Sequence, residues 1–247
     1  MPADATDPDL PRLYRDSRAR VVSLVSSLGD AALGAEAPAC PAWSVRDVVA
    51  HLTAVAEDAV AGRLAGPPSD EQTAAQVARF AGRDVTEILA RWAAVALRFE
   101  YLIGRSRARA AVIDMASHEH DIRGAIRQPG ARDAEAVWHS AEWLLTGLRP
   151  SVPLRVVVED GQFRLGSGNG PELRLTTSRF EAFRWRMGRR SRGQLAALDW
   201  SGDPAPVIDD LTVFGPAATT SSSSPWWKPR RPSYHRGTFT FGTEAAG

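Results

Sequence analysis

Three residues, two of them four positions apart, could together bind a divalent metal ion. Asp114 and His118 lie in the segment AVIDMASHEHDIR, residues 111–123, and His51 lies far upstream. On a helix, a spacing of four places both side chains on one face, one turn apart. Two imidazoles and one carboxylate suit Zn²⁺ or a similar divalent ion, and they leave coordination positions for water or substrate.

Each of these residues also has a purely structural interpretation. His51 could be a hydrogen-bonded core histidine, and Asp114 with His118 could form an ion pair on a helix surface. Two observations favour the metal site. Facing helices of a bundle are where metal sites are built. Asp114 also lies in the apolar run AVIDMA, where a lone buried carboxylate would cost several kcal/mol and so needs a partner.

The elements that must position these residues are predicted to be helices. Apolar residues at helical spacing indicate helices over 10–28, 45–64, 108–126 and 134–148, with a further helical region over 69–103 that is broken near residue 82. The predicted N-caps are Ser44, Ser69, Asp84 and Asp133. Four long helices and a connector predict an antiparallel bundle.

The chain changes character after Pro150. The short segments PLRVVVED, GQFRLG and ELRLTT alternate with turn signals and predict an antiparallel sheet. A helix capped by Ser178 and a short helix in PAPVIDDL follow. The predicted fold class is therefore α+β. We expect a four-helix bundle over residues 8–150, a small α+β domain with an antiparallel sheet over 151–216, and a flexible Ser-, Pro- and Gly-rich tail over 217–247.

Composition and charge exclude several classes of protein. A net charge of +1 gives no field that favours nucleic acid or an anionic membrane surface. The single cysteine, Cys40, excludes an intramolecular disulfide and a multi-thiolate zinc site. The N-terminus lacks the apolar core of a signal peptide, and no apolar run approaches the length of a membrane span. We expect a cytoplasmic protein that binds neither nucleic acid nor membrane.

Three segments together resemble one known family. They are PAWSVRDVVAHL (residues 41–52), the pattern D-x-x-x-H-x-x-D-I-R (114–123) and FRWRMGRRSRGQLAALDWSGDPAP (183–206). Their combination resembles the mycothiol-dependent maleylpyruvate isomerase family, typically found in actinobacteria. The resemblance implies a DinB-like four-helix bundle with a small C-terminal α+β domain, a bound Zn²⁺ and mycothiol as cosubstrate.

The resemblance also implies roles for individual residues. In that family, a histidine of the second helix and a Glu-x-x-x-His pair on a later helix hold the zinc, and the matching residues here are His51, Asp114 and His118. Aspartate in place of glutamate is one methylene shorter, which leaves the substrate chemistry open. Asp121 is expected to accept a hydrogen bond from the ring nitrogen of His118 that does not bind metal. An ion pair between Asp121 and Arg123 is the alternative.

The other candidates have mainly structural interpretations. Glu119 and His120 face other directions on the helix and are expected to support the structure or to back the metal ligands. Cys40 is expected to pack in its loop, because no basic neighbour in the sequence would activate its thiol. We expect His139 to pack between aromatic residues and His235 to be solvated in the tail.

A cluster of arginines follows the predicted strands. Most of its members are expected on a solvated helix face or at a domain interface. Arg189 and Arg190, in the segment GRRS, are the candidates that could hold a carboxylate of substrate or thiol through bidentate bonds. The cluster consists of Arg184, Arg186, Arg189, Arg190 and Arg192.

Three functions remain open at this stage. The first is a metal-dependent isomerase or transferase that adds a thiol, mycothiol by the resemblance, to an electrophilic small molecule such as maleylpyruvate. The second is a non-catalytic DinB-like protein that binds metal or small molecules. The third is hydrolysis by a metal-bound hydroxide, for which Glu119 and Asp121 are the available bases. The expected assembly is a monomer or a homodimer.

Overall fold

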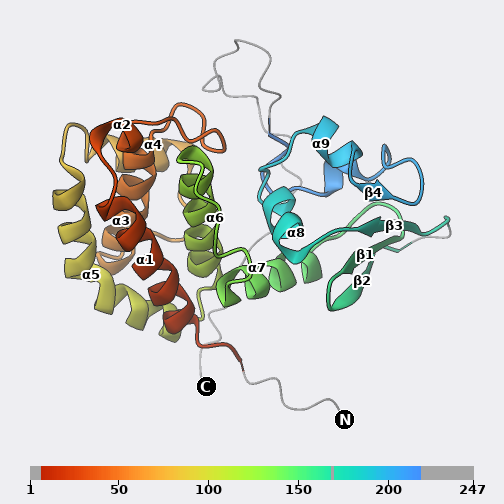
Figure 1. Cartoon of the computed structure of the whole chain (residues 1–247). Helices are drawn as coiled ribbons and strands as arrows, with labels where there is room; N and C mark the ends of the chain where they lie inside the picture. The colour runs from red at the N-terminus through yellow and green to blue at the C-terminus, as the bar shows by residue number, and fades with distance from the viewer. Residues whose placement is uncertain (1–6, 168–169, 218–247) are drawn as a thin grey trace, which may run out of the picture. The chain divides into compact units, whose positions relative to one another are not determined.

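The computed structural model describes residues 7–167 and 170–217, and the chain divides into two compact units. The described part of the first unit, residues 7–129, is helical, and that of the second, residues 130–217, combines helices with a sheet (Figure 1). The predicted fold class, a helical bundle followed by a small α+β part, is confirmed. Within the described ranges, no helix is long and apolar enough to cross a membrane.

Four long helices form the bundle of the first unit (Figure 1). They are α1 (Leu10–Ser26), α3 (Val45–Val60), α5 (Val85–Ser106) and α6 (Arg109–Ala125). Both α1 and α3 pack against α5 and α6, around fully buried side chains that include Val21, Val49, Trp92 and Met115. The short helices α2 (Asp30–Leu33) and α4 (Asp70–Ala78) both contact α3. The contact between α3 and α6 brings the helix of His51 to the helix of Asp114 and His118.

Side-chain caps explain where most of these helices begin. Ser44 and Ser69 each form the predicted capping box, and the carboxylate of Asp84 accepts a hydrogen bond from a backbone N–H of the first turn of α5. The predicted cap at Asp133 is wrong. Helix α7 (Glu135–Thr146) has Ala134 at its N-cap position and no side-chain cap.

The sheet of the second unit is mixed, which corrects the predicted antiparallel sheet. Its strands are β1 (Leu154–Val158), β2 (Gly161–Leu165), β3 (Leu173–Thr176) and β4 (Asp199–Trp200), in the order β2-β1-β3-β4. Strands β1 and β2 form an antiparallel hairpin, but β3 pairs with β1 in parallel, and β4 pairs antiparallel with β3. The apolar β1 takes an inner position and the more polar β2 takes an edge, so β3 joins the free side of β1.

Helices complete the second unit around one hydrophobic core. Helix α7 packs against α8 (Arg179–Arg186), whose N-cap is Ser178 as predicted. Helix α9 (Arg192–Ala196) follows, and the segment PAPVIDDL contains only the 3-10 turn η1 (Ile208–Asp210). The core includes Leu145, Leu154, Val156, Leu175, Trp185 and Leu195.

The two compact units divide between Pro129 and Gly130, which groups α7 with the sheet. A domain boundary near residue 150 stays a prediction. The predicted flexible tail falls almost entirely on residues 218–247, which lie outside the described residues.

Candidate metal centre

The three predicted metal ligands converge where α3 meets α6. The Nε2 atom of His51 lies 3.9 Å from Oδ2 of Asp114, and Nε2 of His118 lies 3.4 Å from Oδ1 of Asp114. One possible ligand atom from each side chain lies within 4.8 Å of the others. Nitrogen and oxygen ligands of a tetrahedral zinc ion lie about 3.4 Å apart, given bonds of about 2.0–2.1 Å. The donor set and its spacing therefore fit a divalent ion with small side-chain adjustments.

A hydrogen bond that the sequence did not reveal orients the buried ring of His51. Its Nδ1 atom lies 3.1 Å from Oε1 of Gln76, a residue of α4 that is itself 1% exposed. The amide oxygen is an acceptor, so Nδ1 carries the hydrogen and Nε2 presents its lone pair toward Asp114. Gln76 thus selects the tautomer of His51 that a metal ion needs.

Asp58 in turn anchors Gln76. The amide Nε2 of Gln76 donates to Oδ2 of Asp58 at 2.8 Å, and Arg63 and Arg79 donate to the same carboxylate. Burial raises the pKa of Asp58, but the hydrogen bonds from Gln76 and the two arginines outweigh it and hold this pKa below its ordinary value. The carboxylate stays ionised at neutral pH and fixes which way the amide of Gln76 points.

Replacing Gln76 by leucine should weaken zinc binding about 10- to 100-fold, the usual cost of losing the partner of a metal-binding imidazole. The ring of His51 would lose the acceptor that fixes its tautomer. Competition with a chromophoric chelator measures the affinity. Gln162→Leu, at an exposed glutamine of β2, is the control and should bind zinc as the unmodified protein does. Unchanged affinity in a folded Gln76→Leu protein would rule out the orienting role.

His118 lies between two carboxylates on α6. Its Nε2 faces Asp114, and its Nδ1 lies 3.1 Å from Oδ2 of Asp121. Burial lowers the pKa of His118, but the charge of Asp114 and the hydrogen bonds to Asp114 and Asp121 outweigh it and hold this pKa well above its ordinary value. The surroundings therefore favour positive charge at this position, which a proton or a divalent ion can supply.

Asp114 provides the open side of the centre. Its side chain is 36% exposed, whereas those of His51 and His118 are 5% and 8% exposed. The prediction that the carboxylate of Asp114 is buried is wrong, because Asp114 and the adjacent Ile113 are both only partly buried. An exposed ligand next to two buried ones leaves room for a small molecule at the remaining coordination positions.

The loop before α3 covers the two imidazoles. The ring of Trp43 lies 5.2 Å from that of His51 and stacks at 6.2 Å over that of His118. Cys40 does not merely pack in its loop, which corrects the prediction. Its Sγ atom lies 3.3 Å from Oδ2 of Asp121 and 3.7 Å from Nδ1 of His118.

Glu119 has a structural role, as one of its predicted interpretations stated. Its fully buried carboxylate accepts hydrogen bonds from Arg20 of α1 at 2.8 Å and from Arg123 at 3.0 Å. The ion pair ties α6 to α1. His120 is also buried, and neither of the two possible donor groups found in the described residues includes it.

The candidate arginines for substrate binding lie in the second unit. Arg190 forms an ion pair with Glu181, with one N···O distance of 2.7 Å, and also donates to the carbonyl of Arg189. Arg189 donates to the carbonyl of Met187 at 2.7 Å. A role for Arg189 and Arg190 in holding carboxylates of substrate or thiol stays a prediction.

Two other arginines of the cluster are buried, so of the two predicted interpretations, a solvated helix face or a domain interface, the solvated face is wrong for them. Arg184 and Arg186 are each 6% exposed. Arg186 donates to the carbonyls of Leu144 and Leu211, and burial lowers its pKa to about 10. These contacts tie α8 to the end of α7 and to the turn after η1.

The remaining histidines are not near the metal ligands in sequence. His139 packs between two aromatic rings as predicted, with ring centroids 4.9 Å from Trp138 and 5.6 Å from Trp143. The prediction for His235 falls outside the described residues.

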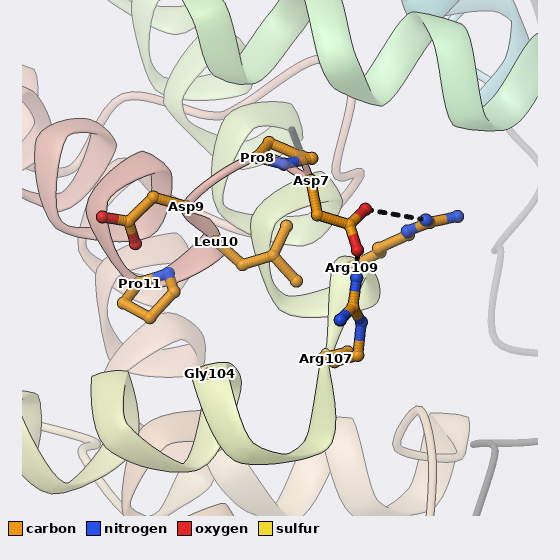
Figure 2. Close-up of a pocket in the computed structure, with 8 residues that line it drawn as sticks. All are labelled: Asp7, Pro8, Asp9, Leu10, Pro11, Gly104, Arg107 and Arg109. Carbon is orange, nitrogen blue, oxygen red and sulfur yellow. Dashed lines mark ion pairs between the residues drawn. The ribbon is translucent and has the colours of Figure 1, made fainter. Parts of the chain in front are cut away.

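A separate cavity of about 240 Å³ lies at the start of α1 and the end of α5 and contains none of the metal ligands (Figure 2). Figure 2 shows Asp7 between Arg107 and Arg109 in this cavity, with ion pairs to both. Because a carboxylate of the chain already pairs with both guanidinium groups, the cavity gives no reason to place the chemistry there.

Two solved structures are similar to this chain. The crystal structure of a mycothiol-dependent maleylpyruvate isomerase with a histidine-to-alanine substitution aligns at 13% identity and a TM-score of 0.55, over 76% of this chain and 92% of that one. A second structure of a mycothiol-dependent maleylpyruvate isomerase aligns over the same shares, at 14% identity and a TM-score of 0.49. No match was found among curated proteins.

The first of these structures shows that the fold is shared. A family model described as the mycothiol maleylpyruvate isomerase N-terminal domain matches residues 14–142, from α1 through most of α7. This match covers just over half of the chain and contains His51, Asp114 and His118. The chain therefore belongs to the mycothiol maleylpyruvate isomerase N-terminal domain family.

Proposed function

We propose that this chain is a metal-dependent enzyme that uses a low-molecular-weight thiol, mycothiol. The enzyme either isomerises an electrophilic small molecule such as maleylpyruvate or transfers the thiol to it. The observation that carries the proposal is that possible ligand atoms of His51, Asp114 and His118 lie close enough together to bind one metal ion. Membership of a family named for this isomerase supports the thiol and the substrate class. A cytoplasmic location and a monomeric or homodimeric state belong to the same proposal.

Some residues of the centre would bind the metal ion, and others orient the side chains that bind it. His51 and His118 would hold the ion, Zn²⁺ in this proposal, through their Nε2 atoms, and Asp114 would hold it through its carboxylate. When bound, the ion supplies the positive charge that keeps the sulfur of a thiol cosubstrate anionic at neutral pH. Gln76 and Asp121 keep the two imidazole rings in the required orientation.

The thiol chemistry has two outcomes. In both, the sulfur forms a bond to an electrophilic carbon of the substrate, and the former double bond becomes a single bond about which rotation is possible. In an isomerisation the C–S bond then breaks, the double bond re-forms with the opposite geometry, and the thiol is released unchanged. In a transfer the carbon next to the new C–S bond takes up a proton, and the adduct is the product.

Consumption of maleylpyruvate by the zinc-loaded protein should require the thiol and should fall to the background rate in its absence. Absorbance of the substrate follows the reaction. Asp114→Asn keeps the size of the side chain but removes the carboxylate charge, and it should also reduce the rate to background. Asp199→Asn, at an exposed aspartate of β4, is the matched control and should keep the full rate. Turnover at the same rate with and without thiol would contradict the proposal.

A non-catalytic metal-binding or small-molecule-binding protein is the second candidate. Aspartate at position 114 favours it, because it departs from the glutamate of the family pattern and leaves Oδ2 3.9 Å from Nε2 of His51. Such a protein would show a higher melting temperature with a ligand from the same substrate screen and would form no product. Hydrolysis by a metal-bound hydroxide is disfavoured further, because both candidate bases are fully buried: Glu119 is ion-paired with two arginines, and Asp121 contacts His118.

A further inference from the structure

We propose that Cys40, His118 and Asp121 form a second metal-binding position, on the opposite side of the His118 ring from the first, and that it selects thiophilic divalent ions such as Cd²⁺. The described residues contain two groups of possible ligands, and these two groups share His118. The group with Cys40 shares His118 with the proposed enzymatic centre, but it needs neither His51 nor Asp114, so binding at it can be measured separately.

The spacing of the three ligand atoms matches one metal ion. The Sγ atom of Cys40 lies 3.7 Å from Nδ1 of His118 and 3.3 Å from Oδ2 of Asp121, and that nitrogen and oxygen are 3.1 Å apart. Around a tetrahedral zinc ion, with a metal–sulfur bond of about 2.3 Å, sulfur lies about 3.5 Å from nitrogen or oxygen ligands, which lie about 3.4 Å from each other; the larger Cd²⁺ needs the three side chains to move slightly apart. All three distances agree with these values to within a few tenths of an ångström.

The backbone holds these side chains in place before any ion binds. His118 and Asp121 are three residues apart on α6, so they share a helix face, and the side chain of Asp121 is fully buried. Cys40 lies in a tight turn: its N–H donates to the carbonyl of Ala37, and its carbonyl accepts from the N–H of Trp43. Cys40 as a whole residue is partly exposed.

The ligand chemistry separates the two positions. The first offers two nitrogens and a carboxylate, a set that suits borderline and harder ions, whereas the second adds a thiolate, which favours soft ions. A neutral imidazole has one nitrogen lone pair. An ion on Nδ1 of His118 leaves the Nε2 hydrogen facing Asp114, and an ion on Nε2 leaves the Nδ1 hydrogen facing Asp121. The two positions are therefore mutually exclusive, and a thiophilic ion should displace an ion from the first.

Absorption spectroscopy of the full-length, metal-free protein tests the second position directly. Cys40 is the only cysteine, so any thiolate-to-metal charge-transfer band must come from it. Titration with Cd²⁺ should produce this band in the ultraviolet difference spectrum, at shorter wavelength than the aromatic absorption, and saturate it at a single equivalent. The band should persist in His51→Ala, which lacks the first ligand set, and should be lost in Cys40→Ser. Neither thiol nor substrate is present, so failure of the proposed enzymatic function would leave this result unaffected.

Two further variants test whether His118 and Asp121 bind the ion together with Cys40 or whether Cys40 binds it alone. Asp121→Asn should weaken Cd²⁺ binding, followed by the same band, by about 10-fold or more, since loss of an outer partner alone costs that much. His118→Ala should weaken it further, with circular dichroism confirming that both variants are folded. No band in the unmodified protein would overturn the proposal. So would a band of equal affinity in both folded variants, because Cys40 would then bind the ion without them.

Discussion

Replacing His118 by alanine is expected to leave the purified protein with almost no bound zinc. His118 is the one residue common to both groups of possible ligands in the described part of the chain. Its loss therefore removes a ligand whichever side of the ring the ion occupies. The affinity should fall by at least about 100-fold, the upper end of what loss of an outer partner alone costs. Elemental analysis of protein purified without chelator measures the metal content.

His139→Ala is the control for this substitution. His139 has one face stacked on Trp143, and its Nε2 atom lies 3.7 Å from the carboxylate of Glu135. It should retain the zinc content of the unmodified protein. Stoichiometric zinc in a folded His118→Ala protein would show that the metal lies elsewhere. His51→Ala separates the two positions, because it removes a ligand of the first and leaves the second intact.

The parts of the site that sequence could predict are encoded locally. Asp114 and His118 lie one turn apart on a single helix, and no tertiary information is needed to place them on the same face. The start of α3 is fixed by a capping box within four residues, Ser44 to Asp47, which sets His51 two turns into that helix. Joining His51 to the other two required only the packing of facing helices in a bundle.

The parts that sequence could not predict depend on contacts between distant segments. Cys40 lies 78 residues before His118, and Gln76 lies 25 residues after His51. Neither has a spacing or a neighbour that marks it. Cys40 reaches the site because a tight turn folds its loop over the end of the bundle, and Gln76 reaches it because α4 packs on α3. Loop closure and helix docking leave no periodic signal in the sequence.

In the second unit, the strand order and the burial of the arginine cluster also depend on contacts between distant segments, which the sequence does not reveal. Alternating residues reveal that β1, β2 and β3 are strands, but period-two patterns do not reveal which strand is a neighbour of which. Arg186 looks like a surface residue in the sequence. It is buried because two backbone carbonyls, at the end of α7 and after η1, accept its hydrogen bonds. Those acceptors exist only once the unit has folded.

Replacing Glu119 by alanine is expected to cost about 3 kcal/mol of unfolding free energy, the lower end of the range for breaking a buried ion pair. The carboxylate is fully buried, and Arg20 and Arg123 both bind it. Removing it leaves two guanidinium groups without this acceptor at the α1–α6 contact. The arginine side chains are 31% and 15% exposed, so water can partly replace the lost contacts, which is why the lower end applies. Urea denaturation measures the change.

Glu87→Ala is the matched control, because Glu87 pairs with Arg83 on the exposed surface at the start of α5. Its cost should stay within about 1 kcal/mol, as for other exposed pairs and first-turn acids. If Glu119→Ala also lost no more than this, the buried ion pair would not stabilise the bundle.

Glu119 is adjacent to His118, yet its contacts are structural. Under conditions where Glu119→Ala is fully folded, it should therefore still bind zinc at the stoichiometry of the unmodified protein. Loss of zinc from the folded variant would instead place Glu119 among the groups that support the metal ligands.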